Sequence, residues 1–120
     1  MFWQGDYQKV YLYTMPCDMR KGFDGLFGLV QNQMLLNPLQ GGLFVFMSGN
    51  RSRVKILHFE NDGLSLYYKR LEKGTFKRPI TSKAPGSVVI SSEDLFLILR
   101  GIDIENTKKR SRFLSQNIVD

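Results

Sequence analysis

The sequence predicts an α+β fold: a mostly antiparallel sheet of four to five strands, one long helix across one face, and a second, short helix near the C-terminus. Three observations predict it. Short segments rich in β-branched and aromatic residues recur, Gly, Pro and Asn-Asp clusters separate them, and helical spacing of apolar residues is confined to two stretches. We expect one domain over residues 1–104, which can bury a modest core, and a basic, flexible tail at 105–120.

Five segments have the composition of strands. The segment LFVFM is apolar on both faces, which is typical of a central strand. The two segments after it are joined by Asn61-Asp62-Gly63, which favours a hairpin, so these three segments should form an antiparallel meander. The expected strands are residues 9–14, 43–47, 53–60, 64–71 and 87–90.

Two segments have helical periodicity. The first, residues 18–36, would begin with Asp18 as N-cap and turn one apolar side towards the sheet. The second begins after Ser91 or Ser92, has acidic residues in its first turn and ends at Gly101. The apolar side of the first helix consists of Met19, Phe23, Leu26, Val30 and Met34.

Three glycines interrupt the first helix, at a cost of about 1 kcal/mol each relative to alanine. Gly25 and Gly28 should project away from the sheet, on the flank that carries Lys21. A strip without side chains lets another backbone or a phosphate approach closely, so we expect Arg20, Lys21, Gly25 and Gly28 to bind a partner. The alternatives are that the glycines face another segment of this chain, or that they mark a weak helix.

The charge balance favours an anionic partner. Seventeen Lys and Arg against eleven Asp and Glu give a formal charge of +6, which suits nucleic acid, an anionic membrane or an acidic protein. The single cysteine, Cys17, excludes an internal disulfide and fits a reducing compartment. The sequence has neither a membrane-spanning apolar run nor the pattern of a signal peptide, so we expect a cytoplasmic protein.

A basic surface with interleaved aromatic residues is expected on the sheet face turned away from the long helix. If Val54, Ile56, Leu64 and Leu66 all meet that helix, alternation along the strands places a cationic set on the far side. Single-stranded or distorted nucleic acid binds to such surfaces. The alternatives are that these charges only protect exposed strands, or that the second helix covers this face. The predicted nucleic-acid-binding residues are Arg53, Lys55, Phe59, Tyr67 and Lys69, extended by Arg51, Arg70 and Lys73 and, in the tail, by Lys108, Lys109 and Arg110.

Catalysis is not expected from this sequence. Metal-dependent strand cleavage needs several convergent carboxylates, and the acidic residues are scattered over turns and helix starts. Cys17 and His58 could be written as a nucleophile and base, but no motif supplies a third, orienting group. One Cys and one His cannot fill four zinc positions, so we expect no metal, no cofactor and no enzyme activity.

Four separated blocks resemble one family. DMRKGFDGL, LFVF, VKILHFE and GLSLYYKRLEKGTF are similar to the TnpB accessory proteins of the IS66 family of bacterial insertion sequences, in consistent order over about residues 7–112. The resemblance implies a protein that assists transposition beside a longer transposase, without catalytic residues of its own. The terminal FLSQNIVD departs from the family pattern. The expected partners are therefore DNA, in particular the element ends, and the transposase; a pure transposase-binding module and a small nuclease are the alternatives.

Overall fold

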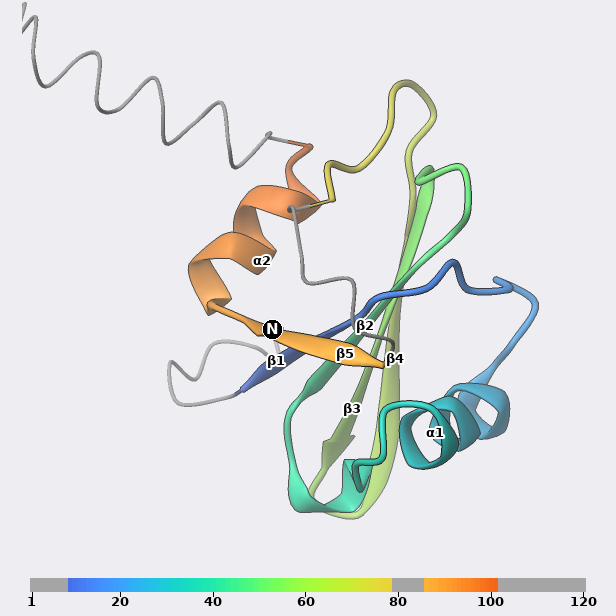
Figure 1. The fold of residues 1–120 in the computed structure, drawn as a ribbon, viewed down its shortest axis with the longest axis vertical. Helices are drawn as coiled ribbons and strands as arrows, with labels where there is room; N and C mark the ends of the chain where they lie inside the picture. The colour runs from blue at the N-terminus through green and yellow to red at the C-terminus, as the bar shows by residue number, and fades with distance from the viewer. Residues whose placement is uncertain (1–8, 79–85, 102–120) are drawn as a thin grey trace, which may run out of the picture.

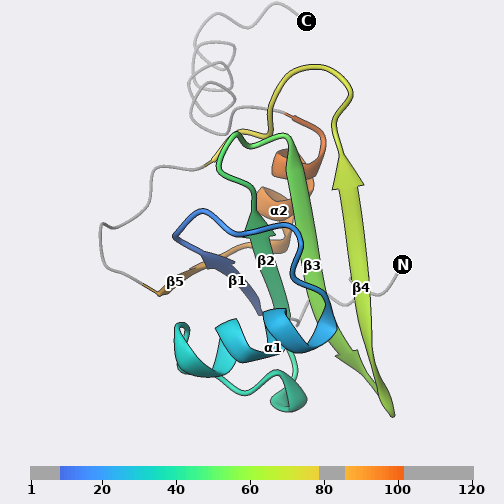
Figure 2. The same ribbon diagram turned by 90° about the vertical axis from the view of Figure 1, so that its right-hand side faces the viewer.

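The sheet has five strands and confirms the predicted α+β class. The computed structural model describes residues 9–78 and 86–101. Its strands lie in the order β4-β3-β2-β1-β5 (Figure 1 and Figure 2). The meander β2-β3-β4 is antiparallel as predicted, but β1 pairs with β2 in parallel, so the sheet is mixed. The strands are β1 Val10–Tyr13, β2 Leu43–Met47, β3 Arg53–Glu60, β4 Gly63–Arg70 and β5 Ser87–Ile90.

The parallel pair follows from the long connection between β1 and β2. This connection contains the helix α1 (Phe23–Asn32) and the short 3-10 helix η1 (Pro38–Gln40), and so carries the chain back to the end where β1 began. Gly42 enters β2 with φ +106°, and a Cβ there would lie 3.0 Å from the Tyr11 ring. Glycine is therefore required where the two strands come together.

Two apolar layers cover the two faces of the sheet. On one face Leu26 and Val30 of α1, and Met34 just after it, pack against Phe44 and Phe46. On the other face lies α2 (Ser92–Leu99), which begins after Ser91; the Ser91 hydroxyl accepts a hydrogen bond from the Asp94 N–H at 2.9 Å, one of the two predicted caps. Figure 1 shows α1 and α2 on opposite sides of the sheet. The second layer buries residues of α2 and of the strands: Leu95, Ile98, Leu99, Val10, Leu12, Val45, Val54 and Ile56.

The helix α1 has ten residues, so the prediction of a long helix over 18–36 is wrong. It begins after Gly22, and Asp18 accepts a hydrogen bond from the Arg20 N–H instead of capping it. The carbonyls of Met19 and Lys21, which a longer helix would use internally, are bound by the Lys55 ammonium. Leu35, at φ 57°, turns the chain away beyond the other end. Contacts from a distant strand therefore shorten α1.

Candidate nucleic-acid interface

The register of β3 and β4 separates the residues that were predicted to share one face. Arg53 lies opposite Arg70 and Lys55 opposite Tyr68, whereas Val54 lies opposite Lys69 and Ile56 opposite Tyr67. Residues directly opposite each other point to the same side of a sheet. Arg53, Lys55 and Phe59 are therefore on the α1 side, and Tyr67 and Lys69 on the α2 side. The prediction that these residues share one basic face is therefore wrong. The sheet face turned away from α1, which was expected to be exposed, is covered by α2.

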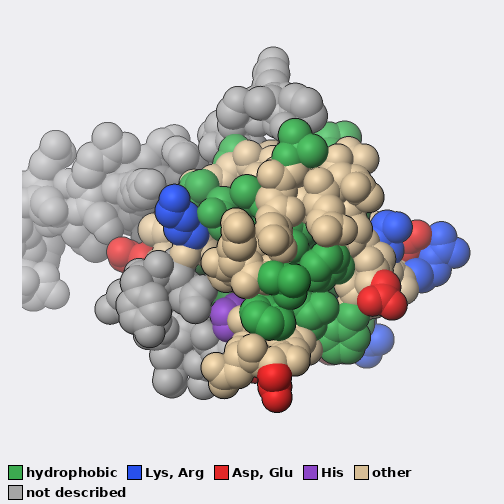
Figure 3. All heavy atoms as spheres, turned by 90° about the horizontal axis from the view of Figure 1, so that it is seen from below, with side chains coloured by type: hydrophobic (Ala, Val, Ile, Leu, Met, Phe, Trp, Pro, Cys, Tyr) green, Lys and Arg blue, Asp and Glu red, His purple; other side chains and the backbone are tan. Residues whose placement is uncertain are grey.

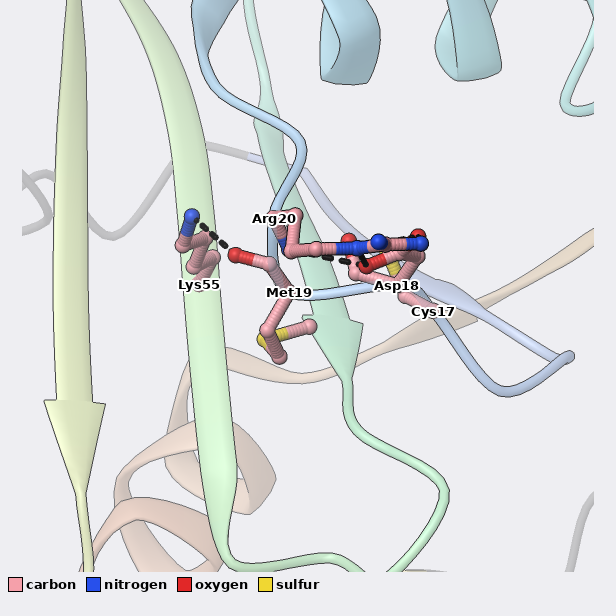
Figure 4. A network of polar contacts seen from close by, with 5 residues as sticks. All are labelled: Cys17, Asp18, Met19, Arg20 and Lys55. Carbon is pink, nitrogen blue, oxygen red and sulfur yellow. Dashed lines mark hydrogen bonds and ion pairs between the residues drawn. The ribbon is translucent and has the colours of Figure 1, made fainter.

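Lys55 is a structural residue and not a surface cation. Only 6% of it is exposed, and its Nζ donates hydrogen bonds to the carbonyls of Met19 (2.8 Å) and Lys21 (2.7 Å). Figure 4 shows the side chain reaching from β3 towards the segment that precedes α1. The ammonium also lies 4.7 Å from the centre of the Tyr68 ring, a cation–π contact. With these partners Lys55 cannot contact a phosphate.

Three more of the predicted nucleic-acid-binding residues lie away from the exposed arginines. The Lys69 ammonium donates to the Leu99 carbonyl at 2.9 Å, in the last turn of α2, where a positive charge suits the helix dipole. Tyr67 packs against the apolar layer beneath α2. Phe59 is half-buried near the acidic β3–β4 turn, far along the strand from Arg53. The predicted residues Lys108, Lys109 and Arg110 lie outside the described part of the chain.

Four predicted residues do come together, at the end of the sheet where β3 begins and β4 ends. We call Arg51, Arg53, Arg70 and Lys73 the arginine end; all four are exposed. The Leu71 N–H donates to the Ser52 carbonyl (2.8 Å) and the Phe76 N–H to the Arg51 carbonyl (2.6 Å), so the segment after β4 folds back beside the turn that carries Arg51. Nearby, burial and the Arg51 guanidinium lower the pKa of Arg78.

Arg53 and Arg70 form a like-charged pair at the centre of this end. They are direct cross-strand partners, an arrangement that destabilises a sheet. Compensation is slight: Arg70 pairs with Glu72 at 2.8 Å on the exposed surface, and Arg53 donates to the Tyr68 hydroxyl at 3.3 Å. Sites that oppose stability in this way are often functional.

Tyr68 is a candidate that the sequence interpretation missed. It is 48% exposed and lies between Lys55 and Arg53 on the α1 side, so its ring can offer a stacking surface beside the arginine end. A hollow of about 370 Å³ lies beside Arg53. The hollow is lined by Cys17, Met19, Ser48, Gly49, Asn50, Ser52 and Arg53.

The predicted partner strip on α1 is open within the described structure. A Cβ added at Gly25 would meet only the Lys21 side chain, at 3.1 Å, and one at Gly28 would meet only Asn32, at 4.0 Å. Among the residues described, none from another segment covers either glycine. Arg20 is also exposed, but its guanidinium binds Asp18 at 2.8 Å and holds the pKa of that carboxyl well below its usual range. Arg20 is therefore an exposed cation with a carboxylate partner, as Arg70 is with Glu72.

The opposite end of the molecule is apolar. It is formed by η1, the end of α1 and the β3–β4 turn, and Figure 3 shows hydrophobic side chains across its middle, with Lys and Arg only at the margins. Leu35 is 79% and Leu39 is 52% exposed there. Phe23, predicted to face the sheet, is 47% exposed because it is the first residue of α1. The exposed cations of the arginine end and this apolar surface are thus at different ends, and the acidic β3–β4 turn lies beside the apolar surface.

Cys17 and His58, the candidate nucleophile and base, do not lie together. Cys17 belongs to the apolar layer under α1, whereas His58 alternates with Val54 and Ile56 and lies on the other side of the sheet. His58 is buried, with its Nδ1 3.2 Å from the Gly42 carbonyl oxygen. Within residues 9–78 and 86–101, no three His, Cys, Asp or Glu side chains are grouped to hold a metal ion, and no helix is long and apolar enough to cross a membrane.

Comparison with known proteins identifies the family. The chain matches the IS66 Orf2-like proteins over residues 8–109, which is most of its length. The chain belongs to this family. The family is associated with transposition of IS66 insertion sequences as an accessory protein and is not known as an enzyme, in agreement with the resemblance found from the sequence.

Two curated relatives are similar over most of the chain. Uncharacterized protein y4hO of Sinorhizobium fredii is 39% identical over 99 residues, covering 82% of this chain and 84% of the relative. Uncharacterized protein y4jC of the same organism is 30% identical over 102 residues, covering 85% and 86%. No solved structure matches the chain. The functional surfaces must therefore be argued from this fold.

Proposed function

We propose that this IS66 Orf2-like protein is a non-enzymatic transposition factor that binds DNA through its arginine end. The observation that carries the proposal is the exposed Arg53–Arg70 cross-strand pair, two arginines directly opposite each other in the ladder, whose side chains contact only the Tyr68 hydroxyl and the exposed Glu72 among the described residues. A phosphate beside them would relieve the repulsion between the two groups and accept charge-assisted hydrogen bonds. Arg51 and Lys73 extend the cationic surface along the backbone, and Tyr68 offers a face for an unpaired base.

The test is a titration of labelled element-end DNA and of shuffled DNA, at two salt concentrations, followed by fluorescence anisotropy. Arg51→Gln with Arg53→Gln should weaken binding about tenfold or more and reduce the slope of log K against log[salt] by about 1.8, since two phosphate contacts are lost. Lys9→Gln with Arg100→Gln removes the same charge elsewhere and should have a much smaller effect. Equal losses in both variants, or no binding by the original protein at low salt, would refute the proposal.

We further propose that the open strip on α1 contacts the transposase. The strip at Gly25 and Gly28 lets another backbone approach, and the exposed Leu35 and Leu39 at the end of this layer supply apolar area. The pure protein-interaction module thus remains the second candidate function. Both surfaces could act in one complex, because the arginine end and the apolar end are far apart on the fold.

A series at Gly28 tests this contact, because a side chain there enters open space. Gly28→Ala and Gly28→Leu should raise or preserve the melting temperature, since both residues favour helix over glycine. Co-purification with the transposase should fall slightly for alanine and strongly for leucine as the strip fills. Undiminished co-purification of the folded leucine variant would exclude the strip as the contact.

A further inference from the structure

The outer edge of the sheet at β4 is regular and unpaired within the described structure. β4 has β3 on one side and forms the edge seen in Figure 2. Its pairing with β3 runs without a bulge from Arg53–Arg70 to Glu60–Gly63. In an antiparallel ladder alternate residues bond to the neighbouring strand, and the Leu71 N–H to Ser52 carbonyl bond assigns the odd-numbered residues to β3. The backbone groups of the even-numbered residues therefore point outwards: Leu64, Leu66, Tyr68 and Arg70.

This edge lacks the features that usually prevent strand pairing. Natural edge strands are short, bulged, interrupted by proline or charged along their length. β4 has eight residues, no proline and no charge from Gly63 to Tyr68. Leu64 and Leu66 are partly buried against the layer under α1, and Tyr68 is 48% exposed, so apolar area continues to the edge. The edge offers both a backbone template and apolar side chains to an added strand.

The charges along the hairpin favour a second copy of this chain as the added strand. One end of the β3–β4 hairpin carries Asp62 in its turn, and the other carries Arg70. Antiparallel pairing of two copies brings these opposite ends together. The acidic group available there is Asp62, because Glu60 accepts a hydrogen bond from the Ser65 hydroxyl. Arg70 is engaged only by the exposed Glu72, a weak surface pair.

We propose that two copies join through antiparallel pairing of their β4 edges, about a two-fold axis at Leu66. Outward-pointing residues must face one another across the new ladder. With Leu66 opposite Leu66 of the second copy, Leu64 faces Tyr68 and Arg70 faces Asp62 of that copy. A register two residues further along would place Asp62 opposite Glu72, so electrostatics disfavours that register. The sheet then continues through both copies.

Sedimentation velocity of the full chain without nucleic acid tests the pairing. We expect the original protein to sediment at twice the monomer mass at micromolar concentrations. Arg70→Glu and Asp62→Lys each place like charges opposite each other and should weaken the dimer at least tenfold. An equimolar mixture of the two variants should restore it, because both contacts of the mixed dimer are then of opposite charge. Lys9→Glu, a reversal at the exposed residue just before β1, should leave the dimer unchanged.

A backbone variant supplies an independent arm. Leu66→Pro removes an outward N–H that the isolated fold does not use, so it should remain folded by circular dichroism and become monomeric. If Leu66→Pro unfolds, the proposal is tested by the charge-reversal variants Arg70→Glu and Asp62→Lys alone. A monomeric original protein at 100-fold higher concentration would overturn the proposal and leave the edge free for a strand of another protein. Failure of the folded reversal variants to associate on mixing would overturn it as well. Because no DNA is present, either result is independent of the nucleic-acid titration.

Discussion

Arg53 and Lys55 are two residues apart on the same strand and point to the same side of the sheet, yet they have different roles. Lys55 is buried and holds the main chain before α1 through two hydrogen bonds, whereas Arg53 is exposed and faces another arginine. Both were predicted to contact nucleic acid on the basis of charge. The difference is set by which segment lies above each side chain. A cation near carbonyl groups supports the fold, and one near other cations is available to an anion.

Replacing Lys55 should produce the largest change in stability. Lys55→Met keeps the aliphatic stem but leaves the carbonyls of Met19 and Lys21 without their donor, so the free energy of unfolding should fall by about 2–3 kcal/mol. Arg53→Met is the matched control on the same face and should change it by less than about 0.5 kcal/mol. Urea denaturation followed by circular dichroism measures both. Similar losses in the two variants would remove the distinction between the residues.

Lys69 extends the comparison to the other face. Lys69→Met removes one hydrogen bond and one favourable charge from the last turn of α2, so the expected loss is about 1 kcal/mol, smaller than for Lys55 because only one carbonyl is involved. Lys73→Met, which alters an exposed cation close in the sequence, is the control. Thermal unfolding distinguishes them, and equal losses in Lys69→Met and Lys73→Met would contradict a structural role for the Lys69 ammonium.

The smallest effect concerns pH and the segment that Lys55 holds. Burial raises the pKa of the Cys17 thiol to about 11, against the lowering effect of Lys21 and Lys55. A raised pKa means that the fold prefers the neutral thiol, so this contribution is complete below about pH 9 and is lost as pH rises towards 11. The original protein should therefore lose stability over this range by up to about 1 kcal/mol more than Cys17→Ser does. Parallel pH profiles of unfolding for the two proteins would contradict this assignment.

The sequence was sufficient where local chemistry determines the structure. The central position of β2, the meander and the start of α2 at Ser91 follow from apolar runs, turn residues and a capping hydroxyl. The start of α1 could not be predicted in this way, because the competing donor, Lys55, is 34 residues from Lys21 in the chain. The same tertiary contact removed Lys55 from the predicted site.

The sequence does contain the information needed to avoid the wrong prediction of a single basic face. A two-residue turn at Asn61-Asp62 pairs Glu60 with Gly63, and this register puts Arg53 opposite Arg70 and Lys55 opposite Tyr68. Assigning faces from that turn would have identified Tyr68 and the arginine pair. That α2 covers the other face, however, depends on how the chain returns after β4, which no local pattern indicates.

The way Lys55 binds the segment before α1 has an evolutionary consequence. Its ammonium recognises main-chain oxygens of Met19 and Lys21, which every amino acid possesses. Substitutions at positions 19 to 21 can therefore accumulate without loosening the anchor, provided that the backbone path is kept. Related elements could diversify this partly exposed stretch to suit different partners while keeping the same scaffold.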